Sequence, residues 1–117
     1  MLRQTSARRA ADTHKVYSFE DQLPRKPAGI RSLRHLARRI WREYHSRGNR
    51  CPAVIAGRGI PSNGTLASYC LGYTEIVLAR HHRNRMVLIH EMTHALGPRT
   101  HGIRFQNLYA ELLDRYL

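Results

Sequence analysis

The chain has 117 residues, which is enough for one small domain with one hydrophobic core. Hydrophobic residues make up 42% of the sequence, which argues against a disordered chain, and no apolar run approaches the ~20 residues that a membrane helix needs. Twenty Lys and Arg residues against eight Asp and Glu residues give a net charge of +12, which favours anionic partners, nucleic acid above all.

The N-terminal half carries most of this charge, with thirteen basic and four acidic residues in positions 1–50. Residues 1–12 are basic and lack periodicity, so we expect a flexible arm there and one folded domain over residues 13–117. The arm has no apolar segment of the kind found in secretory signals, so we expect a cytoplasmic protein. Residues 14–22 predict a short strand or the first turns of a helix, and residues 23–29 a Pro/Gly linker.

Residues 30–47 have the strongest helical pattern, and Gly48 and Asn49 are predicted to stop this helix. One side of it is an apolar stripe with i, i+3, i+4 spacing: Ile30, Leu33, Ala37, Ile40, Trp41 and Tyr44. Another side is a basic stripe: Arg31, Arg34, Arg38 and Arg42. A solvated face is the ordinary reason for such a stripe, and contact with nucleic-acid phosphates is the functional one.

The middle of the chain predicts a small sheet of about three strands, mostly antiparallel. Residues 52–57 read as a buried strand, residues 58–66 as a turn-rich loop, and residues 67–71 and 74–79 as two further strands. The last of these is expected to offer its edge to an extended substrate. Cys51 and Cys70 are far apart in sequence and belong to no CxxC pair, so we expect two free, partly buried thiols.

Two helices are predicted after the sheet. Asn84 is a suitable N-cap for a helix that is apolar almost all round, and this helix is therefore expected to be buried. Gly97 and Pro98 end it, and a last amphipathic helix runs from about residue 102 to the C-terminus. The predicted fold class is α+β: an N-terminal helix, the sheet, a buried helix and a C-terminal helix.

The buried helix carries the sequence HEMTH at positions 90–94. Histidines at i and i+4 lie on one helix face, so His90 and His94 can bind the same ion, and Glu91 beside them can act as a general base. Inside a buried helix these side chains would be costly polar groups without such a role, at ~1–3 kcal/mol each. We therefore predict a zinc site with His90 and His94 as ligands and Glu91 as the catalytic residue.

A catalytic zinc usually has three protein ligands, and His101 is the best third one because the chain turns back after Gly97 and Pro98. Glu111 on the last helix is the alternative. His81 and His82 precede the metal helix and are expected at the surface.

HEMTHAL followed by HGIRF resembles the SprT-like zinc metalloproteases, and more closely the small metallohydrolases of actinobacteria and their phages. The segment VYSFE at 16–20 and the ending HGIRFQNLYAELLDRYL add to this resemblance, which covers residues 14–117. It implies a zincin-like domain in which His90, His94 and His101 bind zinc and Glu91 is the base. The linker between His94 and His101 is shorter than in typical SprT-like proteins.

The leading hypothesis is hydrolysis of a peptide bond by zinc-activated water. A substrate protein that is bound to nucleic acid would agree with both the HEMTH motif and the positive charge of the chain. Tyr73, Tyr109 or Arg99 could stabilise the oxyanion. One alternative is a zinc endoribonuclease, although a Glu directly after the first His favours the peptidase. Another is a zinc-stabilised nucleic-acid-binding or phage accessory protein without catalysis.

Overall fold

In the computed structural model, residue 20 and residues 22–45, 50–62, 65–71 and 74–117 are described, so the predicted arm at 1–12 lies outside the described residues. The described helices are α2 (Ile30–Tyr44), α3 (Arg85–Ala95) and α4 (Ile103–Tyr116), with a short 3-10 helix η1 (Arg80–His82) before α3. The strands are β1 (Ala53–Ala56), β2 (Ile60–Ser62), β3 (Thr65–Ala67), β4 (Tyr69–Leu71) and β5 (Glu75–Leu78). The fold class is therefore α+β, as predicted.

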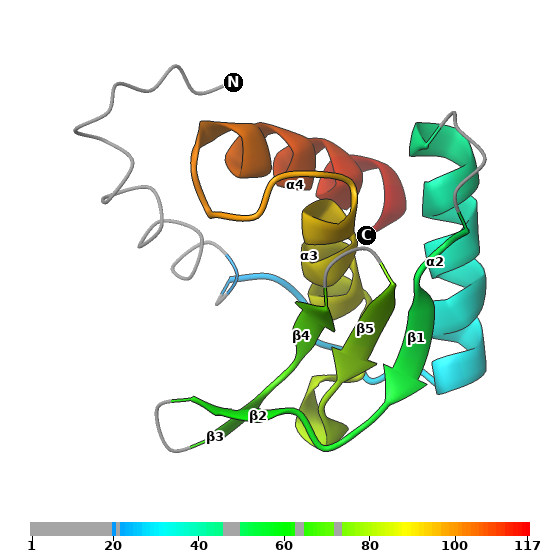
Figure 1. The fold of residues 1–117 in the computed structure, drawn as a ribbon, viewed down its shortest axis with the longest axis vertical. Helices are drawn as coiled ribbons and strands as arrows, with labels where there is room; N and C mark the ends of the chain where they lie inside the picture. Colours follow the sequence, from blue (N-terminus) through cyan, green and yellow to red (C-terminus); the bar gives the residue numbers. More distant parts are fainter. Residues whose placement is uncertain (1–19, 21, 46–49, 63–64, 72–73) are drawn as a thin grey trace.

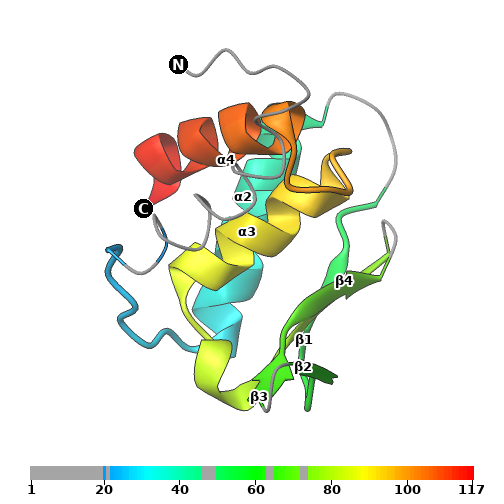
Figure 2. The same ribbon diagram turned by 90° about the vertical axis from the view of Figure 1, so that its left-hand side faces the viewer.

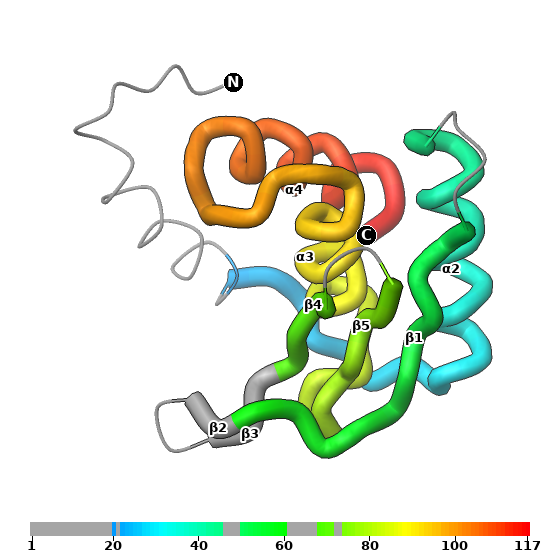
Figure 3. Tube along the Cα trace, viewed as in Figure 1, coloured from blue at the N-terminus to red at the C-terminus, as the bar shows by residue number. Residues whose placement is uncertain are grey.

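The main sheet has three strands in the order β1-β5-β4 and is mixed rather than mostly antiparallel. β4 pairs with β5 antiparallel, but β1 pairs with β5 parallel, with Ala53 opposite Glu75 and Ala56 opposite Leu78. Parallel neighbours need a crossover connection, and the chain between them supplies it through β2, β3 and β4 (Figure 3). β5 is therefore the central strand, and the expectation that it offers a free edge is wrong.

A second correction concerns residues 58–66, which were predicted to be a turn-rich loop. They contain β2 and the start of β3, which pair antiparallel with Ile60 opposite Ala67 and Ser62 opposite Thr65. Strands of three residues are too short to produce a clear alternation of apolar and polar positions.

All three helices lie on the same side of the main sheet (Figures 1 and 2). α2 packs on β1, α3 packs on β4 and β5, and α4 packs on α3. The core fills the space between these layers, and its largest fully buried side chains include Leu33, Ile40, Ile76, Leu88 and Phe105. No helix among the described residues is long and apolar enough to cross a membrane.

α3 is the central helix, and its burial was predicted correctly. The Asn84 side chain accepts a hydrogen bond from the backbone N–H of Val87 at 2.9 Å, which caps the first turn. Leu88, Ile89 and Met92 are fully buried, so apolar contacts surround the helix on several sides. Gly97 ends the helical segment with a φ of +141°, a conformation that glycine adopts without the strain a side chain would add.

Candidate metal centre

Three histidines converge between α3 and the start of α4. The Nε2 atom of His101 lies 3.1 Å from Nε2 of His90 and 3.2 Å from Nε2 of His94. One ligand atom from each of the three residues lies within 4.8 Å of the others. His90 and His94 are one turn apart on α3, and the chain reversal after Gly97 returns His101 to the same point. His101 lies just before α4 rather than within it.

The reversal that carries His101 is held by its own hydrogen bonds. The carbonyl of Pro98 lies 2.8 Å from Nδ1 of His94, and Nε2 of Gln106 donates to the carbonyl of His101 at 3.2 Å. The six residues between His94 and His101 therefore form a defined turn that fixes one ligand and orients another. This supports the prediction of His101 as the third ligand.

Glu20 completes the cluster, and the residue-based reasoning did not identify it as part of the site. Its carboxylate oxygen Oε2 lies 2.6 Å from Nδ1 of His90 and accepts a hydrogen bond from the Tyr109 hydroxyl at 2.5 Å. The Glu20 side chain is only 9% exposed. The only signal in the sequence was its position at the end of the VYSFE segment, one of the few acidic residues in a basic chain.

An aromatic ring underlies the three histidines. Phe105, on the first turn of α4, is fully buried, and its ring centroid lies 5.0 Å from that of His90, 4.6 Å from His94 and 4.7 Å from His101. The ring limits how the imidazoles can rotate and excludes water from their inner side. The Phe of the HGIRF segment therefore has a direct structural role beneath the cluster.

The hydrogen bonds determine which nitrogens face the centre. A carboxylate and a backbone carbonyl only accept hydrogen bonds, so His90 and His94 each carry their proton on Nδ1 and direct the Nε2 lone pair inward. Burial lowers the pKa of His94, and burial together with the neighbouring His90 and His94 lowers the pKa of His101 to about 4. At neutral pH, His94 and His101 are therefore uncharged, as metal ligands must be.

The electrostatic state of Glu20 suits its position beside His90. Burial acts to raise the pKa of Glu20, but the hydrogen bonds that its carboxylate makes with His90 and Tyr109 hold this pKa below its usual value. The carboxylate is therefore ionised and places a negative charge next to the histidine cluster. Burial and the Glu20 carboxylate raise the pKa of the Tyr109 phenol, so the hydroxyl stays protonated and donates.

Glu91 lies next to His90 on α3 and is 7% exposed. Burial raises the pKa of Glu91 to about 7, although His90 acts in the opposite direction. Cys70, on β4, lies close enough for the Glu91 carboxylate to add to the effect of burial, which raises the pKa of the thiol to about 11. Glu91 is thus close enough to β4 to act on Cys70, and it does not belong to the group of converging histidines.

The donor set fits a metal ion. Two nitrogens bound to a tetrahedral ion at about 2.0–2.1 Å lie roughly 3.3 Å apart, close to the measured separations of 3.1 and 3.2 Å. Lone pairs directed at a common point repel each other unless a cation lies between them. Three neutral imidazoles suit zinc and other transition metals better than calcium or magnesium.

The other predicted candidates do not belong to the group of three histidines. Glu111 is exposed on α4 and interacts with Tyr44, outside the group of three histidines, so the structure does not favour it as the third ligand. The Tyr109 hydroxyl is bonded to Glu20 and is not free to stabilise an oxyanion, Arg99 is exposed, and Tyr73 lies outside the described residues. His81 and His82 are in η1, outside the metal group. Arg31, Arg34, Arg38 and Arg42 are exposed on α2, as expected for a basic stripe.

Cys51 and Cys70 are not joined by a disulfide, and both are half-buried, as predicted. Comparisons of the chain with protein-family models, with curated proteins and with solved structures found no match.

Proposed function

We propose that the chain is a zinc-dependent hydrolase with a small zincin-like domain, and that its substrate is a peptide bond. The observation that carries the proposal is the convergence of three imidazole Nε2 atoms next to a buried glutamate on the same helix. The combination HExxH…H, with Glu91 directly after the first ligand, is typical of zinc peptidases, and this also motivates the comparison with SprT-like enzymes.

When bound, zinc lowers the pKa of water and polarises a carbonyl group. His90, His94 and His101 would hold the ion through Nε2. Glu20 and the Pro98 carbonyl keep the first two rings in the required orientation, since each accepts the Nδ1 proton. Glu91 would accept a proton from the attacking water on a carboxylate oxygen and donate it to the leaving amine.

We infer where an extended substrate would bind from the arrangement of the sheet. β4 is an edge strand, it packs beside α3, and its residue Cys70 is electrostatically coupled to Glu91. The free edge of β4 is therefore the better candidate for strand addition than the paired strand β5. A bound peptide would cross the site next to the Glu91 carboxylate.

The test is the Glu91→Gln variant, which is nearly isosteric and removes the proton acceptor. We expect zinc content and thermal stability to stay close to the wild type while hydrolysis falls by about 10²–10⁴-fold. The assay uses casein, a basic DNA-bound protein with and without single-stranded DNA, and an RNA oligonucleotide. Thr93→Ser, a small change on the same helix, serves as the matched control.

Each outcome separates the candidate functions. Protein cleavage that disappears in Glu91→Gln supports the peptidase. RNA cleavage that is retained in the Glu91→Gln variant would contradict the peptidase hypothesis and support the nuclease. A zinc-loaded wild type that cleaves none of these substrates would favour a zinc-stabilised binding protein.

A further inference from the structure

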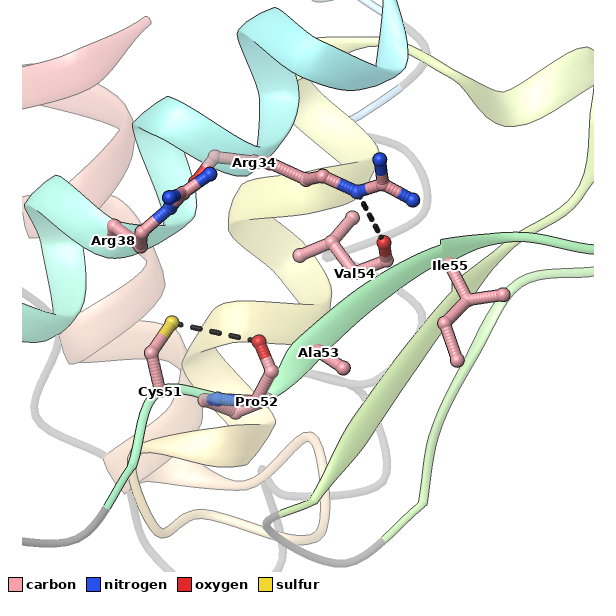
Figure 4. Close-up of a pocket in the computed structure, with 7 residues that line it drawn as sticks. All are labelled: Arg34, Arg38, Cys51, Pro52, Ala53, Val54 and Ile55. Carbon is pink, nitrogen blue, oxygen red and sulfur yellow. Dashed lines mark hydrogen bonds between the residues drawn. The ribbon is translucent and has the colours of Figure 1, made fainter.

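A cavity of about 410 Å³ lies on the other edge of the sheet, between α2 and β1 (Figure 4). Arg34 and Arg38 extend from α2 on one side of it, and residues 51–55 form the other side. β5 separates β1 from β4, and none of the cavity residues belongs to the histidine cluster. The volume is in the range of small-molecule sites, roughly 300–1,000 Å³. The cavity is therefore a second candidate site.

The strand edge inside this cavity is closed to further strands. The Nε atom of Arg34 donates to the carbonyl of Val54 at 2.9 Å, so one of the outward backbone acceptors of β1 is already used. Pro52, immediately before β1, has no N–H to donate. Addition of a peptide strand along β1 would have to break the Arg34 bond, and this excludes the simplest mode of peptide docking.

The same bond fixes the Arg34 guanidinium over the cavity. Within the described part of the chain, its terminal nitrogens are left without an acceptor, and Arg38 lies one helical turn further along α2. Among the residues that the structure describes, no carboxylate forms an ion pair with Arg34 or Arg38. The one acidic residue of α2, Glu43, instead pairs with Arg39 and Arg115 and accepts a hydrogen bond from Tyr116.

The opposite side of the cavity is mainly apolar. Pro52, Val54 and Ile55 contribute hydrophobic surface, and burial raises the pKa of the Cys51 thiol, which therefore stays uncharged. A ligand that satisfies both sides has an anionic group for the two guanidiniums and a flat or apolar body for the strand. A nucleotide or a nucleic-acid strand offers both features, because its phosphate oxygens accept charge-assisted hydrogen bonds from guanidinium groups and its base has a flat face.

We propose that this cavity is a binding site for a nucleotide phosphate, held by Arg34 and Arg38 with the nucleoside against residues 51–55. The phosphate could belong to a free nucleotide or to a nucleic-acid strand, in which case Arg31 and Arg42 continue the contacts along α2. The site is independent of zinc and of the proposed hydrolysis.

The test is a titration of the full-length, zinc-loaded protein with AMP, adenosine, a single-stranded oligothymidylate of about 8 nucleotides and a glutamate-rich peptide. Arg38→Ala removes an exposed guanidinium whose hydrogen bond to the carbonyl of Arg34 is long, at 3.4 Å, so the fold should be retained. Arg39→Ala is the matched control, because it removes the same charge from the next residue of α2, outside the cavity.

We expect Arg38→Ala to weaken binding of the phosphate ligand by about tenfold or more, since a charge-assisted hydrogen bond is lost. Arg39→Ala should change it by about twofold or less, because an exposed charge contributes little. Binding of AMP but not adenosine identifies a mononucleotide site, and binding of the oligonucleotide alone identifies a strand-backbone site. Three results would overturn the proposal. The two variants could weaken binding equally, adenosine could bind as tightly as AMP, or the acidic peptide could bind more tightly than the phosphate ligands.

Discussion

The histidine cluster and the Arg34/Arg38 cavity differ in how their functional groups are held. In the cluster, Nδ1 of His90 donates a hydrogen bond to Glu20 and Nδ1 of His94 donates one to the Pro98 carbonyl. The Phe105 ring packs against all three histidines. In the cavity, one backbone bond holds Arg34, and the guanidinium of Arg38 is exposed. Substitutions in the cluster should therefore disturb metal binding and folding together, whereas substitutions in the cavity should disturb binding alone.

The largest effect is expected from His94→Ala. We expect loss of the stoichiometric metal and a lower melting temperature, because metal bound only to the folded state contributes to folding free energy. Elemental analysis and thermal unfolding measure the two effects, with His81→Ala as the control because His81 is exposed in η1. A wild-type protein purified without chelator that contains no transition metal would contradict the existence of the site.

Glu20→Gln should have the next largest effect. The amide keeps the size of the side chain but removes the charge that holds the His90 Nδ1 proton, so metal affinity should fall by about 10–100-fold. Competition with a chromophoric chelator measures the affinity. Glu111→Gln is the matched control, and a larger loss in that variant would mean that Glu111, and not Glu20, supports the metal.

A smaller effect is expected from Tyr109→Phe, which removes the hydroxyl that donates to the buried Glu20 carboxylate. Loss of a hydrogen bond to a charged group should lower the free energy of unfolding by about 1–3 kcal/mol. Denaturant unfolding measures this difference. Tyr44→Phe is the comparison variant, because it removes the hydroxyl of a half-buried tyrosine near Glu111 and Arg115, outside the histidine cluster, and the change there should stay within about 0.5–1.5 kcal/mol. If both variants lose the same free energy of unfolding, the Glu20–Tyr109 hydrogen bond does not stabilise the fold more than an ordinary tyrosine contact.

The smallest effect on stability is expected from Arg38→Ala, whose side chain is exposed. The free energy of unfolding should change by no more than about 0.5 kcal/mol. Oligonucleotide binding should become less dependent on salt, by about 0.7 in the log–log slope for each phosphate contact removed. A large loss of stability without a change in this slope would mean that Arg38 has a structural role. The cavity would then not differ from the histidine cluster in its effect on folding.

The sequence was most informative where the signals are local. The start of α2 at Ile30, the Asn84 cap of α3 and the convergence of His90, His94 and His101 all follow from spacings within a few turns. These features depend on helical periodicity and on one short reversal. They needed no knowledge of which distant segments pair.

The features that were missed are long-range. The parallel pairing of β1 with β5 depends on a crossover that no local pattern records, and it moved the free edge of the sheet from β5 to β4. Glu20 is 70 residues away from His90 in sequence, and a lone acidic residue before a linker carries no periodic signal. The sequence suggests Tyr109 as a group that stabilises an oxyanion, but it does not indicate that the Tyr109 hydroxyl donates to Glu20.

The separation between Glu20 and His90 also bears on the order of folding. The three histidines lie within twelve positions of the chain, so a short loop brings them together at small entropic cost. We expect the Glu20 carboxylate to reach His90 later, because α2 and the sheet lie between these two residues in the chain. Because long loops close more slowly than short ones, an ion captured early by the histidines would be bound first weakly and then more firmly. The three histidines would thus bind the ion before the Glu20–His90 hydrogen bond completes the site.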